Sequence, residues 1–376
     1  MRILHVVPTY LPATRYGGPI VSVHGLAKAL ARRGNEVDVF TTNVDGDGDS
    51  AVPLQTAVPL DGVNVHYFAS TFRRVYRSPG MRAALQASVG NYDVVHLHSV
   101  YLWPTFAAAR LAQQRGIPYV ISPRGMLVPE LIARRNRLIK TVWLELIERR
   151  NFAHAAAVHF TSQQEWDDAK QVALPLPSPF VIPNGVDVPP LADVPRDPNL
   201  VLFLGRIHWK KGLDRLIAAM QQLPDARLVI AGGDEEGLAA TLPKDPRVTF
   251  AGEVHGPAKD ELLQRASLLV LPSLNENFGN VVLEALAAET PVVVTRGVGL
   301  AETVANADAG IISDDDPRAL ADAIGALLAD RERARAMGRR GRELVAASFS
   351  WDRVAAEMEA AYRGAAWSSA TSPRSS

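Results

Sequence analysis

Residues 271–291 read LPSLNENFGNVVLEALAAETP, and we expect this stretch to carry the chemistry of the protein. The apolar run Leu268–Leu271 ends at Pro272, as a buried strand does, and a polar loop follows. A helix is predicted to begin near Asn280, because apolar residues then recur at helical spacing, namely Val281, Val282, Leu283, Ala285 and Leu286. A strand, a loop and a helix in this order form one unit of a parallel α/β sheet.

Two carboxylates flank the start of this predicted helix. Glu276 lies in the loop, and Glu284 lies about one turn inside the helix, on the same side as Asn280. Free backbone N–H groups at a helix N-terminus bind anions, and Gly279 lets the backbone approach a ligand closely. The segment therefore predicts a site for an anionic ligand; the simpler alternative is an ordinary helix with acids near its N-terminus.

The alternation of strands and helices continues along nearly the whole chain, which predicts parallel sheets flanked by helices. At 376 residues, the chain is long enough for two domains. The expected strands are residues 3–7, 37–41, 63–68, 94–98, 118–122 and 156–160, then 200–205, 226–231, 248–250, 268–271, 291–295 and 310–312.

Prolines crowd together in residues 174–199, as in a connection between domains. We therefore expect an N-terminal domain of residues 1–185 and a C-terminal domain of residues 186–350. Helices are expected at residues 19–33, 316–329, 331–347 and 351–363. Residues 43–61 are interpreted as a mobile loop, and residues 364–376 as a disordered tail.

Composition excludes several classes of protein. The absence of cysteine rules out disulfides, thiolate chemistry and cysteine-based metal sites. The sequence contains no uninterrupted apolar stretch of 18 residues, and its first residues do not have the layout of a signal peptide. The formal net charge is zero, with a basic first half and an acidic second half. We expect a cytoplasmic protein without a nucleic-acid partner.

Two further loops follow predicted strands and could bind an anion. Gly17 and Gly18 precede the first helix, although the motif is not GxGxxG and a glycine turn is the alternative. Arg206 and Lys211 follow the first strand of the second domain and could clamp a diphosphate; a solvated basic turn is the alternative. The latter loop and residues 272–279 should share one rim of the sheet.

Histidines provide a weaker signal. His96 and His98 point to one face of a strand, but no third ligand is evident, so we expect no metal site. His98 ends its strand and is expected to line a cleft.

In combination, these motifs resemble the retaining glycosyltransferases of family 4, which have the GT-B fold. In that fold two Rossmann-like, doubly wound parallel-sheet domains face each other across a cleft. The resemblance spans nearly the whole chain. It rests on Glu276 and Glu284 with Phe278-Gly279 between them, Gly205-Arg206 with Lys211-Gly212, residues 182–187 (IPNGVD), Gly17-Gly18 and residues 299–302 (GLAE).

The resemblance implies a nucleoside diphosphate sugar (NDP-sugar) donor, held mainly by the second domain, and neither a metal nor another cofactor. Arg206 and Lys211 would hold the diphosphate, Glu284 would bind the ribose, and the loop at Glu253 would receive the base. The implied catalytic residues are Arg206, Lys211 and Glu276, and the implied donor-binding residues are Gly17, Gly18, Glu253, Val254, Asn277, Phe278, Gly279, Asn280 and Glu284.

One position departs from the family pattern. Many relatives have a histidine near the donor sugar after the fifth strand of the first domain, whereas this chain has Arg124 there. Arg124 and His98 are therefore assigned to the acceptor or sugar side. The helix at residues 351–363 is expected to pack back on the first domain.

Residues 131–150 are predicted to form a helix that carries Arg and Lys beside apolar residues. It would either rest on an anionic membrane at the inner face or be a solvated basic helix. The implied activity is transfer of a sugar to a saccharide or lipid-linked saccharide, in bacterial polysaccharide or glycolipid biosynthesis. The alternatives are an NDP-sugar 2-epimerase of the same fold and a non-catalytic sugar-nucleotide-binding protein.

Overall fold

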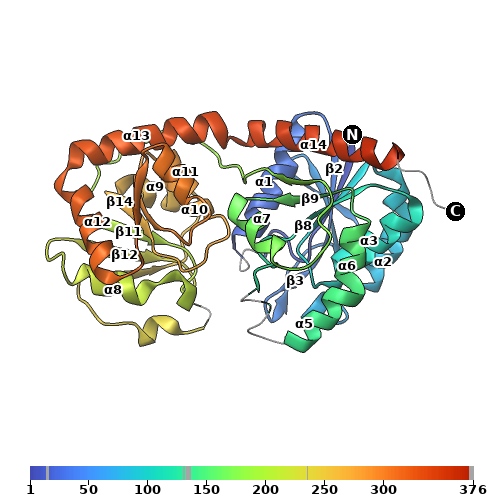
Figure 1. Cartoon of the computed structure of the whole chain (residues 1–376), viewed down its shortest axis with the longest axis horizontal. Coiled ribbons are helices and arrows are strands. Elements are labelled where there is room, and N and C mark those ends of the chain that lie inside the picture. The colour runs from blue at the N-terminus through green and yellow to red at the C-terminus, as the bar shows by residue number, and fades with distance from the viewer. Residues whose placement is uncertain (14–16, 130–131, 133–136, 235, 372–376) are drawn as a thin grey trace. The chain divides into compact units, whose positions relative to one another are not determined.

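The computed structural model describes residues 1–13, 17–129, 132, 137–234 and 236–371 (Figure 1). The chain divides into two compact units. The first comprises residues 1–185 and 351–376, and the second comprises residues 186–350. Each unit contains a sheet of mainly parallel strands with helices packed on it, which confirms the expected class of two Rossmann-like α/β domains.

The sheet of the first unit has the strand order β10-β9-β8-β7-β1-β2-β6-β5. All neighbouring strands are parallel except β5 and β6, which pair antiparallel. The central strands are buried along their length, as helices on both faces require. The strands are β1 (Arg2–Val6), β2 (Glu36–Thr42), β5 (Ala57–Leu60), β6 (Val63–Phe68), β7 (Val94–His98), β8 (Tyr119–Ser122), β9 (Ala157–Phe160) and β10 (Pro179–Val181), with a separate pair β3 (Val44–Asp45) and β4 (Gly48–Asp49).

Helices connect these strands. They are α1 (Gly18–Arg32), α2 (Pro79–Ser88), α3 (Trp103–Arg115), α5 (Arg137–Trp143), α6 (Arg149–Ala153), α7 (Gln163–Lys170) and α14 (Trp351–Thr371). A π-helix, η4 (Leu144–Glu148), joins α5 to α6. The expected helix of residues 131–150 is therefore three consecutive segments, and its residues 131 and 133–136 lie outside the described residues.

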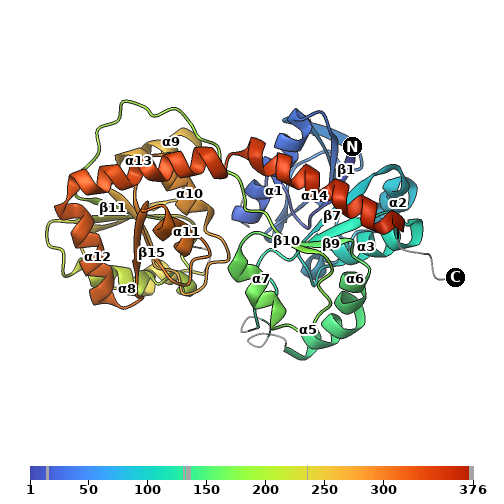
Figure 2. The same cartoon turned by 45° about the horizontal axis from the view of Figure 1, so that its top comes forward.

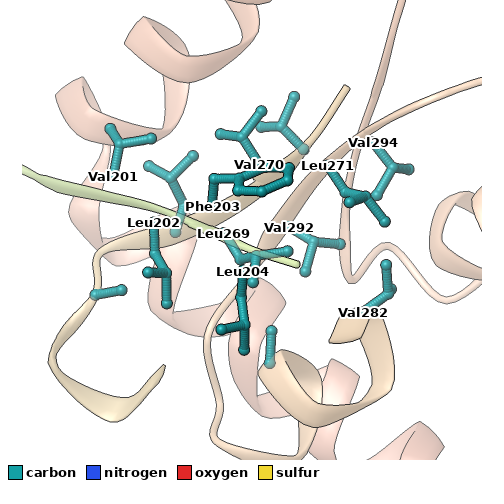
Figure 3. Packing of buried hydrophobic residues seen from close by; sticks show 14 of the residues in the cluster. Val201, Leu202, Phe203, Leu204, Leu269, Val270, Leu271, Val282, Val292 and Val294 are labelled. Atoms are coloured by element: carbon teal, nitrogen blue, oxygen red, sulfur yellow. The ribbon is translucent and has the colours of Figure 1, made fainter. Parts of the chain in front are cut away.

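The sheet of the second unit is wholly parallel, in the order β13-β12-β11-β14-β15-β16. Figure 3 shows the side chains of its central strands packed with Val282 of α10 (Asn280–Ala287) in one continuous core. The strands are β11 (Leu200–Leu204), β12 (Arg227–Ala231), β13 (Val248–Gly252), β14 (Leu268–Leu271), β15 (Val292–Thr295) and β16 (Gly310–Ser313). The other helices are α8 (Leu213–Met220), α9 (Gly256–Arg265), α11 (Ala301–Asn306), α12 (Pro317–Ala329) and α13 (Arg331–Ser348).

The last helix, α14, belongs to the first unit and packs along α1 (Figure 2). The indole of Trp351 lies directly on Gly25 and Gly185; a Cβ atom there would lie 2.2 and 2.5 Å from the ring. Two ion pairs, Arg32–Asp352 at 3.1 Å and Arg33–Glu359 at 2.9 Å, flank the contact.

Two expectations about irregular segments were wrong. Residues 43–61, interpreted as a mobile loop, contain the β3–β4 pair and β5, because β5 completes the sheet edge beside β6. Residues 364–376, interpreted as a disordered tail, continue α14 as far as Thr371, and residues 372–376 lie outside the described residues. Alanines at 365, 366 and 370 favour this continuation.

Candidate active site

Two loops of the second unit lie side by side where their parallel strands end. The first follows β11 and the second follows β14, and these strands are neighbours. The backbone N–H of Leu274 donates to the carbonyl of Lys210 at 2.8 Å. Arg215 donates to the carbonyl of Pro272 at 2.9 Å. Gly212 makes this approach feasible, because a Cβ atom there would lie 2.4 Å from the same carbonyl oxygen.

A third loop, after β15, fixes the backbone of Glu276. Its N–H donates to the carbonyl of Gly297 at 2.8 Å, and its own carbonyl accepts from the N–H of Gly299 at 2.9 Å. A Cβ atom at residue 297 would lie 2.3 Å from the carbonyl oxygen of Leu274. The loops after β11, β14 and β15 are therefore held together by backbone hydrogen bonds around Glu276.

An ion pair joins Lys211 to Glu276 across two of these loops. Both side chains are mostly buried, 19% and 22% exposed respectively. Beside them lies the start of α10, which Gly279 precedes; Gly279 has a φ of 92°, in the left-handed region, and no side chain to cap the helix. The N–H groups of the first turn thus lack the usual side-chain cap and suit an anionic ligand.

Glu284 forms the second ion pair of this region, with Lys259 of α9 at 3.0 Å. Lys259 was not among the predicted site residues, because the sequence of α9 does not indicate which neighbouring helix it will contact. Glu284 is 22% exposed and Lys259 is 27% exposed, so the pair lies at the edge of the core. The predicted anion site at the start of α10 therefore has one Lys–Glu pair before the helix and another that involves a residue within it.

The other predicted donor residues of the second unit are more dispersed. Arg206 is exposed and, within the part of the chain that the structure describes, forms no ion pair. Glu253 is also exposed and reaches the loop after β12, where a Cβ atom on Gly233 would lie 2.5 Å from its carboxylate. Phe278 is buried in the core, so only its backbone is available to a ligand.

In the first unit, Gly17 has a φ of 74° and precedes α1, which begins at Gly18. Arg124 follows β8 with a φ of 56°, an uncommon conformation for a non-glycine residue that often marks functional sites. Its guanidinium donates to Asn184 Oδ1 at 2.8 Å and contacts His98 Nδ1 at 3.3 Å. Burial lowers the pKa of Arg124 to about 10, so the side chain stays charged at neutral pH.

Two buried acids hold the loops that carry these residues. Glu165 accepts from the N–H of Gly125 at 2.6 Å and from Thr161 at 2.7 Å. Glu148 accepts from the N–H of Tyr101 at 2.8 Å, and burial raises its pKa. Neither acid was among the predicted site residues, because their roles depend on which loops the tertiary fold brings beside them.

Four buried histidines lie beneath Arg124. Ring nitrogens of His96 contact the hydroxyls of Tyr362 and Ser122, each at 2.6 Å. Ser122 in turn contacts His159 Nδ1 at 2.6 Å, and His159 Nε2 lies 2.8 Å from the carbonyl of Ile182. Burial is the main cause that lowers the pKa of each of these histidines, to about 3 for His5 and His159.

The carbonyl of Ile182 determines which group donates in each of these hydrogen bonds, from His159 through to Tyr362. A carbonyl only accepts, so His159 carries its proton on Nε2 and its Nδ1 accepts from the hydroxyl of Ser122. Ser122 then accepts from His96 Nε2–H, and His96 Nδ1 accepts from the hydroxyl of Tyr362. The α14 helix is thereby linked to β7, β8 and β9 by a single ordered chain.

Arg124 orders the remaining histidines in the same way. Its guanidinium only donates, so His98 Nδ1 accepts and His98 Nε2–H donates to His5 Nδ1 at 2.9 Å. His5 Nε2–H is left buried without a partner among the described residues. His5, His96 and His98 lie close enough to hold a metal ion, a proximity hidden in the sequence because His5 comes from β1. A cation there would have to displace these hydrogen bonds beside the charge of Arg124.

An apolar surface lies on the helical segment 138–147 of the first unit. Its members are Leu138, Ile139, Val142, Trp143, Leu146 and Ile147, and Leu138 and Leu146 are 82% and 73% exposed. Spacings of four residues place them on one side of the helix. Arg134 and Arg135, two of the basic residues of the predicted helix 131–150, lie outside the described residues. Among the described helices, none combines the length and apolar character needed to cross a bilayer.

Comparison with known families covers both units. Residues 17–185 match the family model of the glycosyl transferase 4-like domain, and residues 192–344 match that of the glycosyl transferases group 1. D-inositol 3-phosphate glycosyltransferase of Xylanimonas cellulosilytica is 32% identical over 401 residues, which cover 95% of this chain and 94% of the relative. An uncharacterised glycosyltransferase of Methanocaldococcus jannaschii is 29% identical, with coverages of 96% and 98%.

Solved structures resemble the fold over almost its whole length. Sucrose-phosphate synthase of Thermosynechococcus elongatus superposes with a TM-score of 0.77 at 26% identity, covering 96% of this chain and 98% of its own. Anabaena HepE, solved in complex with UDP-glucose, superposes with a TM-score of 0.73 at 18% identity, with coverages of 96% and 99%. At that identity the second likeness concerns the fold alone.

Proposed function

Because the chain belongs to the group 1 glycosyl transferases and has the GT-B fold, we propose that it moves a sugar from an NDP-sugar to a saccharide or lipid-linked saccharide acceptor. The configuration of the anomeric carbon is retained, and no metal ion or other cofactor is required. The reaction serves the assembly of a bacterial polysaccharide or glycolipid.

The observation that carries this proposal is the convergence of Lys211, Glu276 and the uncapped start of α10 at one edge of the sheet. The diphosphate of the donor would take the helix N-terminus and the ammonium of Lys211. Glu276 would then lose its ion pair with Lys211 and accept hydrogen bonds from hydroxyl groups of the transferred sugar. Glu284 would bind the ribose, and the base would lie near Glu253 and Val254.

Departure of the nucleoside diphosphate is the step that these groups assist. The bond between the anomeric carbon and the distal phosphate oxygen breaks, and negative charge develops on that oxygen. Lys211, Arg206 and the N–H groups of Asn277 to Asn280 would stabilise this charge without reorganising. The acceptor hydroxyl adds to the same face of the sugar and gives its proton to the departing phosphate.

Arg124 has a different role in this proposal. Its pKa of about 10 makes it a poor base at neutral pH, so it would bind the sugar or the acceptor by hydrogen bonds. Asn184 and His98 hold the guanidinium in place, and Gly17 and Gly18 would contribute backbone N–H groups to the diphosphate.

The acceptor side of the proposal includes a membrane. The apolar surface of residues 138–147 would rest on an anionic bilayer, with Lys140, Arg149 and Arg150 toward the headgroups. Such a position would give access to a lipid-linked acceptor. The relatives named for D-inositol 3-phosphate add a soluble inositol phosphate to the acceptors that should be tried.

The test combines donor binding with product analysis. Thermal-shift screening of NDP-sugars would identify the donor, and release of nucleoside diphosphate would then be measured with each candidate acceptor. Acceptor-dependent release, together with a glycosylated product of retained configuration, is expected. Turnover of UDP-N-acetylglucosamine without any acceptor would instead identify a 2-epimerase, and donor binding without release would identify a non-catalytic protein.

A further inference from the structure

The second unit has a separate recess at the end of its sheet where the parallel strands begin. Lys211 and Glu276 lie at the other end, where the strands finish. The recess has a volume of about 290 Å³ and is lined by Arg196, Glu289, Arg335 and Arg339. Arg196 precedes β11 and Glu289 precedes β15, so both lie where parallel strands begin. The recess is therefore distinct from the proposed donor site.

Arg196 forms a fixed part of this recess. One terminal nitrogen donates to the carbonyl of Ala266 and to Thr290 Oγ1, both at 2.9 Å. The other donates to the carbonyls of Ala288 at 3.0 Å and Glu289 at 2.8 Å. These four bonds use four of the five N–H groups of a guanidinium. Arg196 consequently holds its positive charge in place and cannot turn outward to find a counter-ion.

Two more arginines are brought to the recess by α13. The helix approaches the end of α10 very closely at Gly338, where a Cβ atom would lie 1.9 Å from the carbonyl oxygen of Glu289. Arg335 and Arg339 are four residues apart and thus lie on the same side of α13. Both are exposed at the recess, so their guanidinium groups can reorient toward a ligand.

The charges of the recess are not balanced by the protein. Three guanidinium groups face one carboxylate, that of Glu289. Within the described part of the chain, no carboxylate lies within 4.0 Å of Arg335 or Arg339, whereas the neighbouring Arg340 pairs with Asp308 at 2.7 Å. Burial lowers the pKa of Arg196; the carboxylate of Glu289 acts against this shift, and the charge of Arg335 adds to it to a smaller extent.

We propose that this recess binds a phosphate monoester. Arg335 and Arg339 present guanidinium forks that match phosphate oxygens, above the fixed charge of Arg196. A phosphate monoester carries about −1.5 to −2 charges at pH 7, which offsets the excess of two positive charges. A volume near the lower end of the range for small-molecule sites fits a small phosphorylated ligand. Glu289 is available to accept hydrogen bonds from hydroxyl groups of that ligand.

The test measures binding of inorganic phosphate and glucose 6-phosphate by isothermal titration calorimetry. Arg335→Gln combined with Arg339→Gln removes the two forks, while Arg331→Gln combined with Arg333→Gln makes the same charge change elsewhere on α13, at two exposed positions. We expect affinity to fall at least tenfold in the first double variant and to stay within twofold of wild type in the second. Equal affinities in the two double variants would overturn the proposal.

Two further arms separate this site from the donor site and identify the source of the phosphate. Lys211→Gln should bind glucose 6-phosphate as wild type does, and loss of binding there would assign the phosphate to the donor site instead and overturn the proposal. Vesicles containing phosphatidic acid test whether a lipid can supply the monoester. Capture that depends on Arg335 and Arg339 would identify a lipid headgroup, and binding of glucose 6-phosphate alone would identify a soluble ligand.

Discussion

Lys211 forms an ion pair with Glu276, which lies 65 residues further along the chain. The pair joins two loops that follow neighbouring strands, and it stands beside the start of α10. Glu276 therefore pairs with the same cation that the proposed function assigns to the diphosphate. The proposed function therefore requires the donor to separate Lys211 from Glu276 before sugar transfer.

Lys211→Gln should lower kcat about a hundredfold or more, because loss of one group that stabilises the developing charge costs about 3 kcal/mol in the transition state. Steady-state kinetics on nucleoside diphosphate release measure this effect. Lys210→Gln is the matched control, since the ammonium of Lys210 lies over the ring of Trp209. A Lys211→Gln enzyme with wild-type kcat would refute the role of the clamp.

Glu284→Gln should weaken donor binding about tenfold to a hundredfold, as expected when a charge-assisted hydrogen bond to a hydroxyl is lost. Calorimetric titration of the unreacted donor gives the affinity. Lys259→Gln is the informative partner variant, because it releases Glu284 from its ion pair and leaves the carboxylate free. Its donor affinity should equal or exceed that of wild type, and a loss like that of Glu284→Gln would show that the pair acts structurally.

The first unit should lose stability as the pH falls below about 6.5. The folded state holds the pKa of His5 and His159 at about 3 and also lowers that of His96 and His98, so the unfolded chain binds protons first. The stability is thus present above pH 6.5 and is lost toward pH 3. Each histidine contributes a loss of about 1.4 kcal/mol at pH 5.5, or about 6 kcal/mol for four.

Urea unfolding followed by tryptophan fluorescence measures this dependence, because all tryptophans except Trp209 belong to the first unit. His159→Gln should reduce the dependence on pH by about a quarter, and His154→Gln, at an exposed position, should leave it unchanged. An unfolding free energy that stays constant between pH 7.5 and 5.5 would contradict the lowered pKa values of the buried histidines.

Leu138→Glu combined with Leu146→Glu should reduce binding to anionic vesicles at least tenfold. These two side chains are the most exposed of the apolar surface, and each would lose about 1.5–3 kcal/mol of apolar burial. Flotation with vesicles containing phosphatidylglycerol measures the effect, with Leu191→Glu in the second unit as the control. Equal flotation of the wild type, the double variant and the Leu191→Glu control would contradict the proposal that this surface binds a membrane.

The sequence was sufficient to predict the fold class and most strands, because apolar runs between turn residues are a local property. The strand over residues 268–271 and the helix start at Asn280 agree with the structure. The start of a helix could also be predicted where Pro or Gly precedes an apolar periodic segment, as at the start of α1. The extension of α14 to Thr371 was missed, since a run of Ala and Ser lacks the periodic pattern on which the prediction relied.

Contacts between distant segments could not be predicted in the same way. Several contacts depend on which helix or strand becomes a neighbour. They are the ion pair of Glu284 with Lys259, the approach of His5 to His96 and His98, and the hydrogen bonds of the buried acids Glu148 and Glu165. Periodicity indicates that a residue is buried but not what it will touch. The loops after β11 and β14 were an exception, because adjacent parallel strands bring their following loops to one edge.

The seating of Trp351 on Gly25 and Gly185 has a consequence for biosynthesis. The first unit is assembled from two segments that are far apart in the sequence, residues 1–185 and 351–376, since α14 supplies Trp351 and Tyr362 to its interior. When only the first 185 residues have left the ribosome, the surface of the nascent domain that α14 will cover is therefore still exposed. This surface is covered only after the whole second unit has been synthesised. Translation of the first unit therefore begins before that of the second unit but is completed after it.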